Sequence, residues 1–223
     1  MPEPTINVIA CEALRLELEA VRRDGTAVHY MDFALHRTPK IMPGRLQAAV
    51  AETESLEYDA SGEIIMAYGL CANGVVGLSA ARGLIIPRCH DCVGILLGSP
   101  ERYREYFSRR PGTLYLFAGF IEARLDPLSV LETRDRPRLG PKADRLAHLA
   151  LQHYTHIAYI DNGTSSDPAH KERFRDNCDF FQKEPWEIEG DLDYVRRLLY
   201  GPRQPSDFVT LPAGRELTAE VFF

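Results

Sequence analysis

The chain has 223 residues, of which 45% are hydrophobic and 26% are charged, and its formal net charge is −6. This composition is typical of a globular protein and excludes disordered, collagen-like and low-complexity chains. Lys and Arg together number 26 against 32 Asp and Glu, and no basic run stands out, so we expect no binding to nucleic acid.

The first half of the chain alternates predicted strands and helices. Apolar runs predict strands at residues 5–10, 27–32, 63–70 and 83–88. Helix-forming stretches predict helices at residues 12–18, 43–55 and 91–107, with a further short helix at 75–81. The helix at 43–55 begins at Pro43, and proline is favoured at the first helical position.

The second half continues the same alternation after one irregular stretch. Strands are predicted at residues 113–119, 156–161 and 207–211, and helices at 141–152, 168–181 and 192–200. Residues 120–140 are charged, contain prolines and lack periodicity. We therefore expect this stretch to run over the surface.

The central strand candidates are continuously apolar rather than alternating, as in strands that helices cover on both faces. Together with the recurring strand and helix order, this predicts an α/β fold with a doubly wound, mostly parallel sheet and Rossmann-like or flavodoxin-like layering. We find no internal repeat and no long linker. The prediction is one domain over residues 1–223, with 120–140 as a surface insertion.

The sequence also predicts a cellular compartment. No apolar stretch reaches the ~18 residues that a membrane-spanning helix needs. The acidic, proline-bearing start lacks the basic region of a signal peptide. We therefore expect a cytoplasmic protein with no membrane partner. In a reducing compartment its five cysteines are expected to be metal ligands, catalytic thiols or core residues rather than disulfides.

Three cysteines follow directly after predicted strands, namely Cys11, Cys71 and Cys89. Because parallel strands end at one edge of a sheet, and ligands bind at that edge, we expect these thiols to meet there. Cys92 follows Cys89 at CxxC spacing, near the start of a predicted helix whose positive end favours thiolate.

Thiolates and imidazole suit zinc, iron or copper(I), and we favour zinc or iron. Four ligands, Cys11, Cys71, Cys89 and Cys92, would make a closed structural site, whereas three would leave an open catalytic position. The three-ligand alternatives are Cys71 and Cys92 with either Cys89 or His90. His90 is otherwise a candidate proton carrier, and Asp91 is expected to orient it.

Two other interpretations of the cysteines stay open. Free cysteine is often a small buried apolar residue, which we expect for Cys178. Alternatively, Cys89 and Cys92 form a dithiol redox pair, which needs neither Cys11 nor Cys71.

Further polar residues are predicted at the same edge. Tyr68, Gly69, Asn73 and Gly74 belong to a turn that is either a cofactor-binding loop or a plain connection, since glycine permits close backbone approach. Residues 161–167 either bind an anion or cap the next helix. His36 is either a further ligand or acid/base group at the edge, or an exposed loop residue.

Three motifs support a family resemblance: Tyr-Gly-Leu-Cys-x-Asn-Gly at 68–74, Ile-Pro-Arg-Cys-His-Asp-Cys at 86–92 and Leu-Leu-Gly-Ser at 96–99. With them the chain resembles a bacterial and archaeal domain-of-unknown-function family that is often encoded beside corrinoid-dependent methyltransferases for methylated amines. The resemblance implies a cytoplasmic protein of one-carbon or cobamide metabolism. A corrinoid protein or methyltransferase is the implied partner.

Three functions follow as hypotheses. In the first, the protein is a metal-dependent methyltransferase acting on a small-molecule methyl donor or acceptor, with a cobamide reaching it through a partner protein. In the second, it is an accessory protein that binds a metal, a cobamide or a corrinoid protein without turnover. In the third, it is a CxxC redox protein.

Overall fold

The computed structural model describes residues 6–55 and 62–223. These residues form two compact units, which we call unit 1 (up to Arg102, and 191–223) and unit 2 (Tyr103–Gly190). Each unit has its own sheet. In the described part of the chain, every helix is too short or too polar to cross a membrane.

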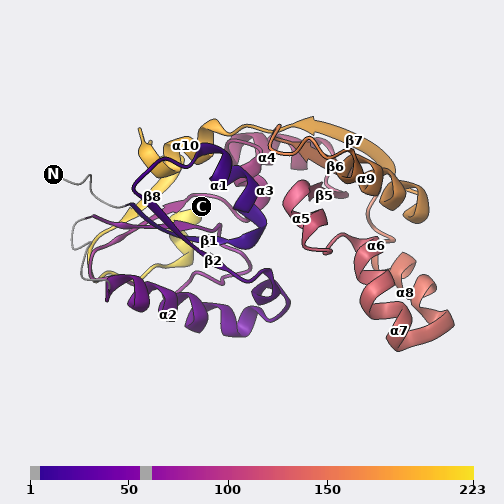
Figure 1. The fold of residues 1–223 in the computed structure, drawn as a ribbon, viewed down its shortest axis with the longest axis horizontal. Helices are drawn as coiled ribbons and strands as arrows, with labels where there is room; N and C mark the ends of the chain where they lie inside the picture. The colour runs from indigo at the N-terminus through magenta and orange to yellow at the C-terminus, as the bar shows by residue number, and fades with distance from the viewer. Residues whose placement is uncertain (1–5, 56–61) are drawn as a thin grey trace. The chain divides into compact units, whose positions relative to one another are not determined.

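Unit 1 is built on a five-stranded sheet with the strand order β2-β1-β3-β4-β8 (Figure 1). The first four strands are parallel and β8 is antiparallel to β4. The strands are β1 (Ile6–Cys11), β2 (Thr26–Met31), β3 (Ile64–Ala67), β4 (Leu84–Pro87) and β8 (Phe208–Leu211).

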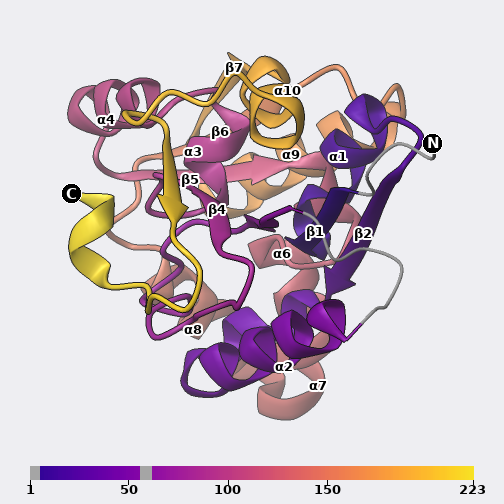
Figure 2. The same cartoon turned by 90° about the vertical axis from the view of Figure 1, so that its left-hand side faces the viewer.

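Helices cover both faces of this sheet. Figures 1 and 2 show α2 on one face and α1 with α10 on the other. The helices of unit 1 are α1 (Arg15–Val21), α2 (Met42–Glu54), α3 (Cys92–Leu96) and α10 (Asp193–Tyr200), and α4 (Pro100–Arg109) runs from unit 1 into unit 2. Short 3-10 helices lie at Glu12–Leu14, Phe33–Arg37, Pro39–Ile41 and Ala219–Phe222. Every residue of β3 and β4 is buried, as expected for strands between two helical layers.

Unit 2 contains a parallel sheet of three strands in the order β5-β6-β7. The strands are β5 (Thr113–Phe117), β6 (His156–Asp161) and β7 (Glu184–Glu189). The helices are α5 (Ala118–Glu122), α6 (Pro127–Val130), a π-helix (Leu131–Asp135), α7 (Arg136–Leu139), a 3-10 helix (Gly140–Lys142), α8 (Ala143–Ala150) and α9 (Pro168–Phe181). Leu116, Ile157 and Phe174 form the centre of a buried cluster that joins the sheet to α9.

The predicted α/β class and mostly parallel pairing are confirmed. The strands divide between two sheets, where one sheet was expected. The single domain over residues 1–223 stays a prediction.

Four local predictions need correction. Residues 75–81 form turns instead of a helix, because Gly77 has a φ of +87° and residues 77 and 78 bond to Leu217. The helix expected at 91–107 is divided into α3 and α4, since Gly98 has a φ of +88°. Both glycines adopt the left-handed conformation, which interrupts a right-handed helix.

The other two corrections concern unit 2. Residues 120–140 are largely helical, and Leu128 and Leu131 pack with Phe181 in a buried cluster, so the stretch is not a surface excursion. Strand β7 was not predicted, because its sequence is polar and only Ile188 is fully buried.

Candidate thiol site

The carboxyl edge of the unit 1 sheet has a topological switch point between β1 and β3. Strand β1 has β2 as its neighbour on one side and β3 on the other, so the direction of strand succession reverses at β1. Helices α1 and α2 lie on opposite faces of the sheet. In open α/β sheets the crevice at such a point is the usual place for a ligand. Cys11 is the last residue of β1, and Tyr68 follows directly after β3.

Cys11 and Tyr68 meet at this point, and both are almost fully buried. Burial raises the pKa of the Cys11 thiol to about 11, although the neighbouring Tyr68 hydroxyl opposes that rise. Burial, and then the Cys11 and Cys71 thiols, raise the pKa of Tyr68. The Tyr68 hydroxyl oxygen is buried, and no described residue meets the geometry of a full hydrogen bond to it. Its weak contact with Cys11 leaves this buried hydroxyl able to bond more strongly to a thiolate or a ligand.

Cys71 lies in a left-handed turn just beyond β3. Cys71, Ala72 and Asn73 have φ angles of +46°, +55° and +67°. Consecutive left-handed residues other than glycine cost of order 1–2 kcal/mol each, and such strain is concentrated at functional sites. The Cys71 N–H donates to the carbonyl of His90 at 2.8 Å, which ties this turn to the loop after β4.

Cys92 completes the group from the first residue of α3. Asp91 caps that helix, since its Oδ1 accepts a hydrogen bond from Val93 N at 3.0 Å. Burial, then Asp91, Cys11 and Cys71, raise the pKa of the Cys92 thiol. Burial, then Cys11, Asp91 and to a smaller extent Cys89, raise that of Cys71. Cys11 thus acts on Cys71 and Cys92, and Cys71 acts on Cys92. With Tyr68 we call these three cysteines the thiol site.

Cys89 faces a different set of neighbours. Its Sγ atom lies 3.4 Å from the Tyr194 hydroxyl, which donates to the carbonyl of Asp207 at 2.6 Å. Burial raises the pKa of Cys89 to about 12, and the Tyr194 hydrogen bond opposes that rise. Tyr194 lies on α10, far along the chain, and sequence analysis gave no signal for it.

The two glycines of the turn after β3 bring backbone segments together. A Cβ on Gly69 would lie 2.7 Å from the Asp91 Cα atom and 2.8 Å from the Cys89 carbonyl oxygen. A Cβ on Gly74 would collide with the side chain of Met42. Position 69 therefore requires glycine, since the neighbouring atoms belong to the backbone, whereas a side chain at position 74 would require Met42 to shift. Asn73 is exposed beside them.

His90 and His36 approach this edge from different loops. His90 is exposed, and its ring centroid lies 5.3 Å from that of Phe223. His36 is half-buried, with its ring stacked 4.7 Å from Phe33 and 6.3 Å from Tyr68. Burial lowers the pKa of His36, so its neutral form is favoured. The stack places an imidazole beside the thiol site.

The thiols lie near one another without forming a ready coordination shell. Within residues 6–55 and 62–223, no three His, Cys, Asp or Glu side chains are arranged to hold a metal ion. The donor types nevertheless suit a thiophilic ion. Cys178 lies in unit 2, buried in the cluster around Phe174.

Residues 30–199, about three quarters of the chain, match a protein family described as a protein of unknown function, DUF1638. No curated protein and no solved structure matches the chain.

Proposed function

The chain belongs to the DUF1638 family, and we propose that it is a metal-dependent enzyme of methyl transfer, with a zinc or iron ion held by Cys11, Cys71 and Cys92. One observation carries this proposal. Thiols from the end of β1, the turn after β3 and the start of α3 lie close enough at the switch point of the sheet that Cys11 raises the pKa of Cys71 and Cys92. Ligands of open α/β sheets bind at such a point.

The electrostatics of the thiol site favour a cation. Burial raises the pKa of Cys11, Cys71 and Cys92, and repulsion from Cys11 adds to the rise at Cys71 and Cys92, so ionising several of them together is costly without a compensating charge. A bound divalent cation reverses this balance and deprotonates its thiol ligands. Thiolate ligands select zinc and iron over magnesium or calcium.

Metal binding requires the thiols to move closer together. The proposal requires the side chains of Cys71 and Cys92 to rotate toward one another. Such rotations leave the backbone hydrogen bonds of both loops in place. The buried Tyr68 hydroxyl would gain a thiolate acceptor. Three protein ligands leave a fourth position open, where the ion would lower the pKa of a bound thiol or similar nucleophile.

The neighbouring residues have separate proposed roles. His90 is exposed on the loop that bonds to Cys71, so it can carry a proton between the site and solvent. Asp91 holds the first turn of α3 and thereby positions Cys92. Gly69 allows the two loops to approach, and Tyr68, Asn73 and Gly74 belong to the loop that we propose to contact the substrate or cofactor.

The methyl donor is the part of the proposal that rests on family resemblance. We infer a cobamide, brought by a corrinoid protein or methyltransferase, and a small-molecule methyl acceptor. A non-catalytic accessory protein would use the same site to hold a metal or to dock the cobamide carrier. A CxxC redox role is disfavoured, because Cys89 faces Tyr194 and burial raises both thiol pKa values, whereas reactive dithiols have lowered ones.

A turnover assay tests the proposal. The full chain, purified without oxygen and loaded with zinc or iron, is mixed with methylcobalamin as donor and 2-mercaptoethanol as acceptor. We expect repeated turnover that falls at least about 100-fold in Cys71→Ser and is kept in Cys178→Ser, the matched buried control in unit 2. Cobalamin binding without turnover would support the accessory alternative, and neither binding nor turnover would contradict both.

A further inference from the structure

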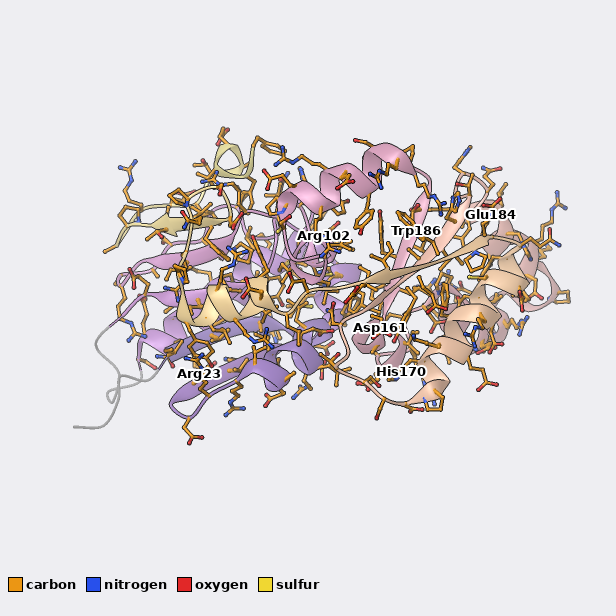
Figure 3. All side chains as sticks on the ribbon, turned by 90° about the horizontal axis from the view of Figure 1, so that it is seen from above. Arg23, Arg102, Asp161, His170, Glu184 and Trp186 are labelled. Atoms are coloured by element: carbon orange, nitrogen blue, oxygen red, sulfur yellow. The ribbon has the colours of Figure 1, made fainter. Side chains whose placement is uncertain are left out.

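Unit 2 holds a second group of chemically active side chains, remote in sequence from the cysteines of the thiol site. Ser165 lies in the loop after β6, His170 on the first turns of α9, and Glu122 at the end of α5, which follows β5 directly. All three therefore come from segments at the carboxyl ends of parallel strands. Lys171, the neighbour of His170, pairs with Asp161 at 2.8 Å, and Asp161 is the last residue of β6, so the first turns of α9 lie at that end of the sheet (Figure 3).

The three side chains, which we call the relay, are joined by one hydrogen bond and one longer contact. Ser165 Oγ lies 2.8 Å from His170 Nδ1, and His170 Nε2 lies 3.6 Å from Glu122 Oε1. Ser165 Oγ also accepts a hydrogen bond from Asp167 N at 3.2 Å. Among the described residues, the imidazole is the one acceptor bonded to this hydroxyl, and the tautomer with an unprotonated Nδ1 takes its proton. A hydroxyl, a base and a carboxylate that orients the base are the parts of an activated nucleophile.

Two members of the relay, His170 and Glu122, line a pocket with room for a small molecule, and Ser165 is bonded to the first of them. A cavity of about 500 Å³ is lined by His170 and Glu122, together with Arg124, Glu132 and Arg173 among others. That volume lies in the range typical of ligand sites. The backbone N–H of Ser166, directly after Ser165, makes no hydrogen bond to any described residue. An N–H at this position is where acyl-transfer sites stabilise a developing oxyanion.

Unit 2 contains a second group of a hydroxyl, an imidazole and a carboxylate. We interpret this second group as structural, and it serves as a comparison for the relay. Thr155 Oγ1 lies 2.8 Å from His156 Nδ1, and His156 Nε2 lies 3.1 Å from Glu184. Here the hydroxyl donates to the carbonyl of Gly112, so its proton is directed away from the imidazole. This group lies at the amino ends of β6 and β7, toward the Glu184 label in Figure 3.

We propose that Ser165 and His170 are the nucleophile and general base of a hydrolytic site for small carboxylic esters, with Glu122 as the residue that positions His170. Ser165 Oγ bonds to the ester carbonyl carbon while His170 Nδ1 takes the hydroxyl proton. The bond to the alcohol oxygen breaks, and the alcohol leaves with that proton. Water then attacks the acyl carbon and gives a proton to His170, which returns it to Ser165 as the acid departs.

The charges around the pocket indicate which esters fit. Five carboxylates line it against two guanidinium groups, namely Glu122, Glu132, Asp167, Glu172 and Asp176 against Arg124 and Arg173. Arg173 is already paired with Asp126 and Glu132. The field in the pocket is therefore negative, and it favours a cationic ester over an anionic one.

A fluorophosphonate probe, which bonds covalently to activated serine hydroxyls, tests the proposal on the full chain. We expect labelling at Ser165, located by peptide mass spectrometry, and at least about 100-fold slower labelling in Ser165→Ala and His170→Gln. Thr155→Ala is the matched control and keeps the wild-type rate. Circular dichroism and thermal melting of each variant confirm that it is folded.

Hydrolysis of esters supplies the second measurement. We expect acetylcholine, which is cationic, to be cleaved faster than an anionic acetate ester, and Glu122→Gln to lower kcat with little change in KM and to shift its pH profile. Labelling no faster than in heat-denatured protein, or labelling unchanged in folded Ser165→Ala, would overturn the proposal. A Cys71→Ser variant should label normally, which separates this site from the thiol site.

Discussion

The Sγ atom of Cys89 lies 3.4 Å from the hydroxyl oxygen of Tyr194, so this thiol is turned into the core of unit 1. Cys92, three residues later, has Cys11 and Cys71 among the neighbours that raise its pKa. The two cysteines of the CxxC motif therefore have different surroundings. This division is the reason that we assign Cys92 to the thiol site and Cys89 to the core.

Replacing Cys89 should affect stability more than metal binding. Cys89→Ala removes a buried sulfur and leaves the Tyr194 hydroxyl with its bond to the Asp207 carbonyl. We expect the free energy of unfolding, measured by urea denaturation, to fall by about 1–2 kcal/mol. Metal stoichiometry should stay at the wild-type value. Loss of the metal from a folded Cys89→Ala chain would make Cys89 a ligand.

Alkaline pH should destabilise the metal-free protein through Cys11. Burial raises the pKa of this thiol from 9.0 to about 11, so the folded chain keeps a proton that the unfolded chain releases. Its contribution to stability is complete below pH 9 and is lost as the pH rises to about 11, by roughly 3 kcal/mol. Urea denaturation across this range measures the slope for the wild type and for Cys11→Ala. The variant should show a shallower fall, and equal slopes would refute the assignment.

The close approach at Gly69 predicts a sharp contrast between two glycines. Gly69→Ala places a Cβ 2.7 Å from the Asp91 backbone and should separate the loops that carry Cys71 and Cys92. We expect a loss of about 2–3 kcal/mol in unfolding free energy and weaker metal binding. Gly44→Ala, in α2 with no atom within 4 Å, should stabilise the chain by up to about 1 kcal/mol. Similar effects of the two changes would contradict the packing argument.

In unit 2, the ion pair of Asp126 should matter more than an exposed one. Asp126 is fully buried, and its Oδ1 lies 3.1 Å from Arg173 Nε. Arg173→Met leaves a buried carboxylate without its cation and should lower the unfolding free energy by about 2–3 kcal/mol. Arg175→Met is the control, because Arg175 is 63% exposed and 3.8 Å from Glu187, and it should change stability by less than about 0.5 kcal/mol. Equal losses in thermal or urea denaturation would be inconsistent with this account.

Sequence patterns predicted the strands of unit 1 well, because buried parallel strands are continuously apolar. Residues 64–67 and 84–87 show this clearly. The division into two sheets was not predictable, since an apolar strand gives the same pattern in either sheet. Strand β7 was missed because only Ile188 of Glu184–Glu189 is fully buried. Helix formation at 120–140 depends on packing of Leu128 and Leu131, which no local periodicity reveals.

The candidate site was predictable only where it depends on strand ends. The positions of Cys11 and Cys71 follow from the rule that ligands gather at the carboxyl edge of a parallel sheet. The direction of the Cys89 side chain depends on Tyr194, 105 residues later in the chain. The stacking of His36 on Tyr68 likewise requires the tertiary fold. Such long-range contacts leave no spacing in the sequence.

Metal stoichiometry tests the central claim most directly. Protein purified without oxygen is reconstituted with zinc or iron, and bound metal per chain is measured for the wild type, Cys11→Ser, Cys71→Ser, Cys92→Ser and the control Cys178→Ser. The account predicts close to one ion per chain in the wild type and the control, and loss of the ion in the three thiol-site variants. A wild type that stays metal-free after reconstitution, or thiol-site variants that keep the ion, would contradict it.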